Sequence, residues 1–152
     1  EMTPLGLLNF FGCARGLDSE RLKNRIEAVV DHCAIQSVAN KPIGKLSRGY
    51  RQRVGMANVL LHEPDVLIMD EPTAGLDPNQ IIEVRKTIKE LGKTILLSTH
   101  ILQEVREVAD RIILINQGRI VFQCTPDELS DEPSLDTWFN RKTVASQASQ
   151  TK

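Results

Sequence analysis

Hydrophobic residues recur every three or four positions in three stretches of the first 62 residues, as they do along one face of a helix. Each stretch follows a residue whose side chain is suited to capping a helix N-terminus: Thr3, Asp18 and Ser47. A segment rich in turn-forming residues, 36–45, separates the second stretch from the third and is expected to be a loop. The pattern predicts a helical subdomain over residues 1–62.

The pattern changes after residue 62, where short uninterrupted hydrophobic runs replace the helical spacing. Residues 66–69, 94–98 and 112–115 are such runs, and each is typical of a strand buried on both faces. Helical spacing returns between one run and the next, which favours parallel strands joined by helical crossovers. We therefore expect an α/β core with a parallel sheet over residues 63–130.

Two further segments complete this division of the chain. Residues 120–122 follow a turn centred on Gln117 and Gly118, and they are expected to add a hairpin strand. Residues 131–152 are expected to form a C-terminal helix and a disordered polar tail, because hydrophobic residues become rare after Phe139.

Composition narrows the choice of partner and compartment. Nineteen basic and twenty acidic residues give a net charge of −1, so no nucleic-acid partner is expected. No hydrophobic run is long enough to span a bilayer, and any membrane contact would go through a partner protein. The three cysteines, Cys13, Cys33 and Cys124, are widely separated, which favours a reducing compartment over disulfides. Cys33 lies on the hydrophobic face of its helix and is expected to be buried.

Two adjacent carboxylates follow the first predicted strand. Asp70 and Glu71 would lie at the carboxyl end of a buried strand, where open α/β sheets build their sites. Asp70 could hold Mg²⁺ against nucleotide phosphates, directly or through water, and Glu71 could deprotonate an attacking water. Taken alone, these residues are equally compatible with a purely structural role, in which Asp-Glu-Pro only begins a turn after the strand.

Three other segments carry candidate chemistry. Ser47 and Gly49 stand at a predicted helix N-terminus, where backbone N–H groups and a hydroxyl can bind phosphate. That role is compatible with a plain capping role for Ser47. Residues 74–77 form a tight loop in which Asp77 would cap the next helix. His100 follows the strand at 94–98, at the same sheet edge as Asp70, although a lone histidine is often structural.

In this order the segments resemble the ABC ATPase family. Residues 46–50 resemble its signature motif, residues 67–71 its Walker B strand and residues 74–77 its D-loop, and His100 resembles its switch histidine. The resemblance extends from about Met2 to about Leu129. It implies a P-loop NTPase fold, of which this chain would be the C-terminal part.

The resemblance also implies roles for the matching residues. Asp70 would hold Mg²⁺ through its water shell, while Glu71 and His100 would be catalytic. Two groups would face a second ABC ATPase copy. One group would bind the ATP that the second copy holds, and it consists of Ser47, Arg48, Gly49 and Tyr50. The other group is the D-loop, which consists of Ala74, Gly75, Leu76 and Asp77.

The sequence departs from the family pattern in two respects. Arg48 and Tyr50 replace the commonest glycine and glutamine of the signature, a variant that resembles the branch of ABC-2-type exporters and gliding-motility-like systems. The phosphate-binding pattern G-x-x-x-x-G-K-[ST] is absent, since Gly92-Lys93-Thr94 lacks the first glycine. We therefore expect a chain truncated before the Walker A and glutamine loops, inactive alone and with an apolar sheet face open to water.

The function expected from this resemblance is ATP hydrolysis that drives export through a transmembrane permease, at the cytoplasmic face of a membrane. Two alternatives remain open. One is a soluble ABC ATPase of DNA repair or translation, which long coiled-coil arms or a second tandem domain would support. The other is a non-catalytic module that only presents Ser47 to the ATP of a partner.

Overall fold

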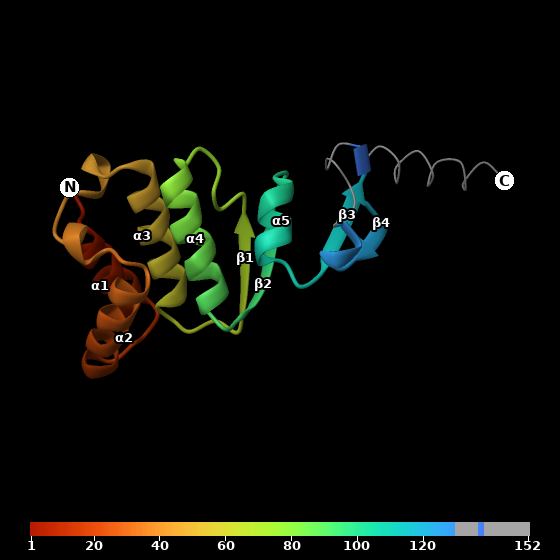
Figure 1. Cartoon of the computed structure of the whole chain (residues 1–152). Coiled ribbons are helices and arrows are strands. Elements are labelled where there is room, and N and C mark those ends of the chain that lie inside the picture. Colours follow the sequence, from red (N-terminus) through yellow and green to blue (C-terminus); the bar gives the residue numbers. More distant parts are fainter. Residues whose placement is uncertain (130–136, 139–152) are drawn as a thin grey trace. The chain divides into compact units, whose positions relative to one another are not determined.

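The computed structural model describes residues 1–129 and 137–138 (Figure 1). The chain forms two compact units, residues 1–98 and residues 99–152. The division expected from the sequence, at residues 62 and 130, stays a prediction. The expected C-terminal helix and polar tail lie outside the described residues, apart from the helical pair Thr137 and Trp138.

The helices of the first unit begin where their capping residues predict. Helix α1 is Pro4–Ala14, α2 is Ser19–His32 and α3 is Arg48–Leu60. The side chains of the three preceding residues, Thr3, Asp18 and Ser47, each accept a hydrogen bond from a backbone N–H of the first turn. Such a cap stabilises a helix by about 1 kcal/mol. The expected loop between α2 and α3 also contains two short 3₁₀ turns, Gln36–Val38 and Ile43–Lys45.

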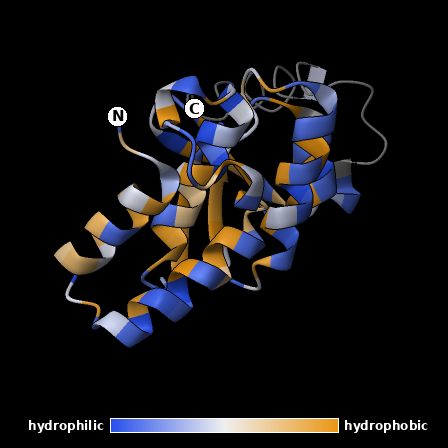
Figure 2. Cartoon of the chain, turned by 90° about the vertical axis from the view of Figure 1, so that its left-hand side faces the viewer, coloured by the Kyte–Doolittle hydropathy of each residue, from blue (hydrophilic) through white to orange (hydrophobic). Residues whose placement is uncertain are grey.

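The three helices pack around a shared hydrophobic core. The exposed face of α2 is mostly hydrophilic, whereas α1 is apolar along most of its length and leaves Phe10 59% exposed (Figure 2). The buried hydrophobic residues of this core include Leu8, Leu22, Ile26, Val29, Cys33, Ile35, Val38, Val54, Ala57, Leu60 and Leu61. Burial of Cys33 confirms the expectation from its helical position.

A strand–helix–strand crossover follows α3. Strand β1, Val66–Asp70, leads into helix α4, Pro78–Glu90, and strand β2, Thr94–Ser98, pairs with β1 in parallel. The register places Val66 opposite Thr94 and Asp70 opposite Ser98. Helices α3 and α4 lie side by side next to this sheet (Figure 1). The predicted parallel crossover is confirmed.

The expectation that these strands are buried on both faces is wrong for the described chain. Leu67 is buried, but Ile68 is 79% exposed and Leu96 is 56% exposed. One face of the two-stranded sheet packs against helices, whereas the other presents apolar side chains to solvent. This outcome agrees with the expectation of an open apolar sheet face.

The second unit contains helix α5, Leu102–Val108, and an antiparallel hairpin. Strand β3, Ile112–Asn116, pairs with strand β4, Arg119–Cys124. The turn residues Gln117 and Gly118 both have positive φ, 49° and 73°, which suits a two-residue hairpin turn. The hairpin is confirmed, and in the described residues β3 and β4 form a two-stranded antiparallel sheet. Because β4 follows β3 after a two-residue turn, it supplies hydrogen-bond partners along one edge of β3.

The hairpin has a small core of its own. Ile112, Cys124 and Trp138 are buried together, and the rings of Phe122 and Trp138 meet edge to face with centroids 5.5 Å apart. The three cysteines are free, as expected. Within the described residues, none of the helices has the length and apolar character needed to cross a membrane.

Two glycines in the helices give a matched test of packing between α1 and α2. A Cβ at Gly12 would strike the buried side chain of Leu22, whereas a Cβ at Gly55 in α3 would meet no atom within 4 Å. Gly12→Ala should lower the free energy of unfolding by about 1–3 kcal/mol through overpacking. Gly55→Ala should raise it by about 1 kcal/mol through helix propensity. Urea denaturation of the two variants checks both signs, and equal effects would contradict the close α1–α2 contact.

The buried thiol of Cys33 gives a test by pH. Burial raises its pKa from the ordinary 9.0 to about 12, and the nearby positive charge of Arg53 offsets part of that rise. The folded protein should therefore keep Cys33 neutral at pH 9, and alkylation with iodoacetamide should label exposed Cys13 first. Labelling of Cys33 should require denaturant. Peptide mass spectrometry measures both sites, and equal labelling rates would contradict the burial.

The same shift sets a pH dependence of stability. In the unfolded chain the Cys33 thiol ionises near its ordinary pKa of 9.0, whereas in the folded chain it ionises near a pKa of about 12. The contribution of the neutral thiol is therefore complete below pH 9 and is lost as the pH rises toward 12.

Candidate functional site

The end of β1 places both predicted carboxylates at one edge of the parallel sheet. Asp70 is the last residue of β1, and Glu71 follows with a left-handed backbone, φ 46°. The backbone N–H of Glu71 donates to the carbonyl oxygen of Ser98 at 3.0 Å, which anchors it to the end of β2. Non-glycine residues held in this conformation are strained, and such strain gathers at functional sites.

Ser98 is part of this site, although the sequence analysis gave it no role. Its Oγ donates a hydrogen bond to Oδ1 of Asp70, which lies opposite it in the register. The only sequence signal was its position at the end of the second strand, because parallel strands that end together bring their last residues side by side. The serine orients the Asp70 carboxylate.

The signature segment forms the first turn of α3. Ser47 Oγ accepts a hydrogen bond from the backbone N–H of Tyr50 at 3.3 Å, as its capping role predicts. Ser47 and Arg48 are exposed, whereas Gly49 is buried. A Cβ at Gly49 would come within 2.5 Å of the side chain of Gln80, so only glycine fits there without moving Gln80.

The D-loop segment is a compact turn between β1 and α4. Two backbone hydrogen bonds close it, from Ala74 N–H to Glu71 O at 3.1 Å and from Leu76 N–H to Thr73 O at 3.2 Å. Gly75 has φ 70°, a backbone conformation that favours glycine. The carboxylate of Asp77 then caps α4 by accepting from the N–H of Gln80 at 3.0 Å.

The signature and D-loop segments are in contact within the first unit. The guanidinium of Arg48 occupies the space where a Cβ at Gly75 would stand, and Gln80 occupies the corresponding space at Gly49. The structure therefore brings Ser47, Arg48, Gly49 and Tyr50 together with the turn that contains Ala74, Gly75, Leu76 and Asp77.

His100 lies at the start of the second unit. The His100 side chain is exposed. The hydroxyl of the preceding residue makes two hydrogen bonds: Thr99 Oγ1 accepts from Ile101 N–H at 3.1 Å and donates to Glu104 Oε2 at 2.5 Å. The peptide around His100 thus has a defined turn. Its placement beside Asp70 and Glu71 stays a prediction, because His100 belongs to the second unit and the two carboxylates belong to the first.

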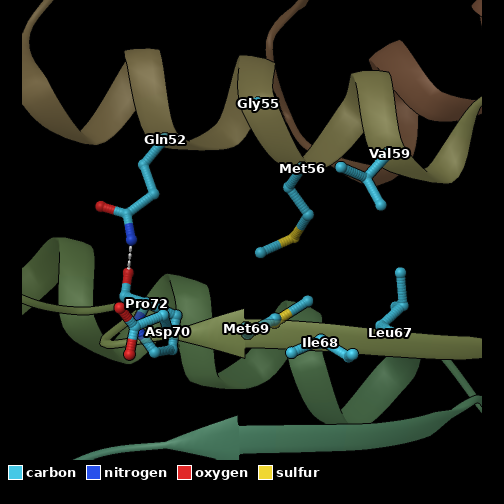
Figure 3. Close-up of a pocket in the computed structure, with 9 residues that line it drawn as sticks. All are labelled: Gln52, Gly55, Met56, Val59, Leu67, Ile68, Met69, Asp70 and Pro72. Atoms are coloured by element: carbon cyan, nitrogen blue, oxygen red, sulfur yellow. Dashed lines mark hydrogen bonds between the residues drawn. The ribbon is translucent and has the colours of Figure 1, made fainter.

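A small apolar pocket lies between α3 and β1 (Figure 3). Side chains of Met56 and Val59 point from the helix toward Leu67 and Met69 of the strand. The pocket has a volume of about 180 Å³, whereas sites for small molecules of nucleotide size span about 300–1,000 Å³. It is therefore a packing gap beside the carboxylates and not a nucleotide site.

The residues at the end of β1 suit a magnesium ion that is shared with phosphate. No cluster of three or more metal-binding side chains occurs in the part of the chain that the structure describes. Magnesium in phosphate-transfer sites needs only one or two carboxylates, with phosphates and water completing its shell. Asp70 is exposed, and Ser98 binds its Oδ1, so Oδ2 can accept a water ligand of the ion.

Comparison with known sequences finds relatives among the ATP-binding proteins of ABC transporters. The family described as "ABC transporter" matches residues 8–74. The ABC transporter ATP-binding protein NatA of Bacillus subtilis is 37% identical over 125 residues, which cover 80% of this chain and 51% of NatA. A Nod factor export ATP-binding protein I of Sinorhizobium fredii is 38% identical over 135 residues, 87% of this chain and 39% of that protein. The chain thus spans about half or less of these relatives.

Comparison with solved structures agrees with the sequence matches. The structure of cbiO1 from Clostridium perfringens, part of the ABC transporter complex cbiONQ, superposes with a TM-score of 0.79 and 31% identity. The match covers 98% of this chain and 61% of cbiO1. The fold is therefore the α/β fold of ABC-type P-loop NTPases, as predicted, and the chain belongs to the ABC transporter ATP-binding family.

Proposed function

We propose that the protein containing this chain hydrolyses ATP to drive export through a membrane permease. The observation that carries the proposal is the end of β1, where Asp70 is oriented by Ser98 and Glu71 is held in a strained turn bonded to β2. These residues supply a metal-facing carboxylate and a potential base at adjacent positions, as phosphoryl transfer to water requires.

Each residue has a distinct part in the proposed reaction. Glu71 accepts a proton from the water that attacks the γ-phosphorus of ATP, as the bond to the bridging oxygen of ADP breaks. Asp70 holds the water shell of Mg²⁺, and the ion supplies positive charge to the phosphates when it is bound. His100 donates a hydrogen bond to the γ-phosphate.

The contacts between chains follow from the first turn of α3. Ser47 and Arg48 are exposed at a helix N-terminus, where the helix dipole favours an anion. We propose that this turn, with Arg48, Gly49 and Tyr50, contacts ATP held by a second copy. The D-loop, Ala74–Asp77, would line the same interface.

Support for a membrane partner and for export comes from the relatives. NatA is named as an ABC transporter ATP-binding protein, cbiO1 is part of a transporter complex, and the Sinorhizobium protein is named for Nod factor export. We propose that this protein likewise sits at the cytoplasmic face of a membrane, bound to a permease subunit or domain.

Substitution of the proposed base tests catalysis in the complete gene product. Glu71→Gln removes the base and keeps the shape of the side chain, so ATP hydrolysis should fall by about 100-fold or more while ATP binding persists. His100→Ala should also lower kcat strongly with little change in binding. Steady-state ATPase assays and equilibrium binding of ATP measure both quantities. Hydrolysis at the parent rate by the Gln variant would overturn the role of Glu71.

The proposed interface gives a second test, made in the Glu71→Gln background so that ATP is retained. Gly49→Asp should abolish the ATP-induced dimer, because it adds a negative charge to the turn that is proposed to contact the γ-phosphate across an isologous interface. Sedimentation velocity with Mg-ATP measures the dimer. Since a Cβ at Gly49 would also displace Gln80, the control is Gly49→Asp combined with Gln80→Ala, which makes room for the new side chain. Dimers that survive Gly49→Asp would refute the interface.

A further inference from the structure

Side-chain contacts join the first two turns of α3 to the segment that carries the D-loop. Gln52 Nε2 donates a hydrogen bond to the carbonyl oxygen of Pro72 (Figure 3). One residue later, the guanidinium of Arg53 forms an ion pair with the carboxylate of Glu83 in α4. These two contacts bracket the D-loop, since Pro72 precedes Ala74 and Glu83 lies in the second turn of the helix that Asp77 caps.

Arg53 occupies the centre of this junction. Its side chain is only 13% exposed, whereas that of Glu83 is 59% exposed, so the arginine is the buried member of the pair. The Arg53 guanidinium carbon lies 5.7 Å from the ring centroid of Tyr50, a residue of the signature turn. Its charge also acts on the Cys33 thiol at the end of α2, whose pKa it lowers against the larger effect of burial. One side chain therefore contacts or influences three helices.

The placement of this charge is costly unless a partner offsets it. A charged side chain that is only 13% exposed, as Arg53 is, needs a partner to offset its lost hydration, and α3 has no acidic residue in its first turn to supply one. Arg51 donates to the carbonyl oxygen of Leu46, a local contact. Arg53 instead reaches across to α4, so its compensation depends on how α3 and α4 are arranged.

We infer that Arg53 is a positioning residue which, with Gln52, holds the signature turn at a fixed place relative to the D-loop. The two segments that are proposed to face a second copy then move as one body. The inference rests on the proposed function, because it assigns to this junction the geometry of the interface. Arg53 acts through Tyr50 and α4.

A charge exchange in the complete gene product tests the inference. Glu83→Arg places two like charges at the junction and should lower kcat by roughly tenfold or more, because small displacements of reacting groups are expensive in rate. The KM for ATP should change much less, since the phosphates are held mainly by other residues. Arg53→Glu combined with Glu83→Arg restores an ion pair and should recover most of the lost kcat and the ATP-induced dimer.

The control uses an exposed ion pair on the same helix, one and two turns beyond Glu83. Lys86 and Glu90 form an exposed pair, 73% and 57% exposed, in α4. Lys86→Glu, alone or combined with Glu90→Lys, should leave kcat unchanged, because exposed pairs contribute little. Gln52→Glu is a second probe, since it keeps the side-chain shape but removes the donor to Pro72, and it should lower kcat with little change in KM.

Thermal unfolding of each variant separates positioning from loss of fold. Because Glu83 is exposed, Glu83→Arg and the more conservative Glu83→Gln should fold, and their unfolding midpoints should stay close to that of the parent. A lower kcat in folded protein, with recovery in the exchange variant, supports the inference. Unchanged kcat in folded Glu83→Arg overturns it, as does a loss that only follows the folded fraction. A parent protein without ATPase activity would instead refute the proposed function itself.

Discussion

Parallel pairing of β1 with β2 is the constraint on which the candidate site depends. The register sets Asp70 opposite Ser98, and the hydrogen bond from Glu71 N–H to Ser98 O carries the pairing one residue beyond the strand. Because both strands end at the same edge of the sheet, the pairing alone brings the Ser98 hydroxyl to the segment that carries the carboxylates of Asp70 and Glu71. A shift of one residue would turn Asp70 to the opposite face and separate it from Ser98.

The position of the signature turn relative to strand β1 depends on the packing of α3. The helix contributes Met56 and Val59 to the apolar gap above β1, while its first two turns reach the D-loop through Gln52 and Arg53. Apolar packing therefore sets the distance between helix and sheet, and polar contacts set where the signature turn stands along the strand. This division explains why a largely hydrophobic interface carries two specific polar contacts at one end.

Sequence patterns were sufficient for the elements whose signals are local. The capping residues Thr3, Asp18, Ser47 and Asp77 each begin a helix, because a cap acts within one turn of the chain. The hairpin turn at Gln117 and Gly118 is equally local. By contrast, burial of β1 and β2 on both faces was predicted from their composition and is wrong here. Composition reports what a strand can bury, not which neighbours are present to bury it.

The candidate site likewise contains residues that local sequence predicts and residues that only tertiary contacts identify. Asp70, Glu71 and the signature and D-loop segments are predicted from the sequence, because each belongs to a contiguous motif whose chemistry follows from its own residues. The roles of Ser98, Gln80, Gln52 and Arg53 came only with the tertiary structure. Each of them acts on a residue at least 20 positions away, or across two helices, and no periodicity marks such a pair. The sequence by itself determined the chemical groups and the local turns that present them, whereas packing decided their alignment, since contact between distant segments depends on how their faces fit.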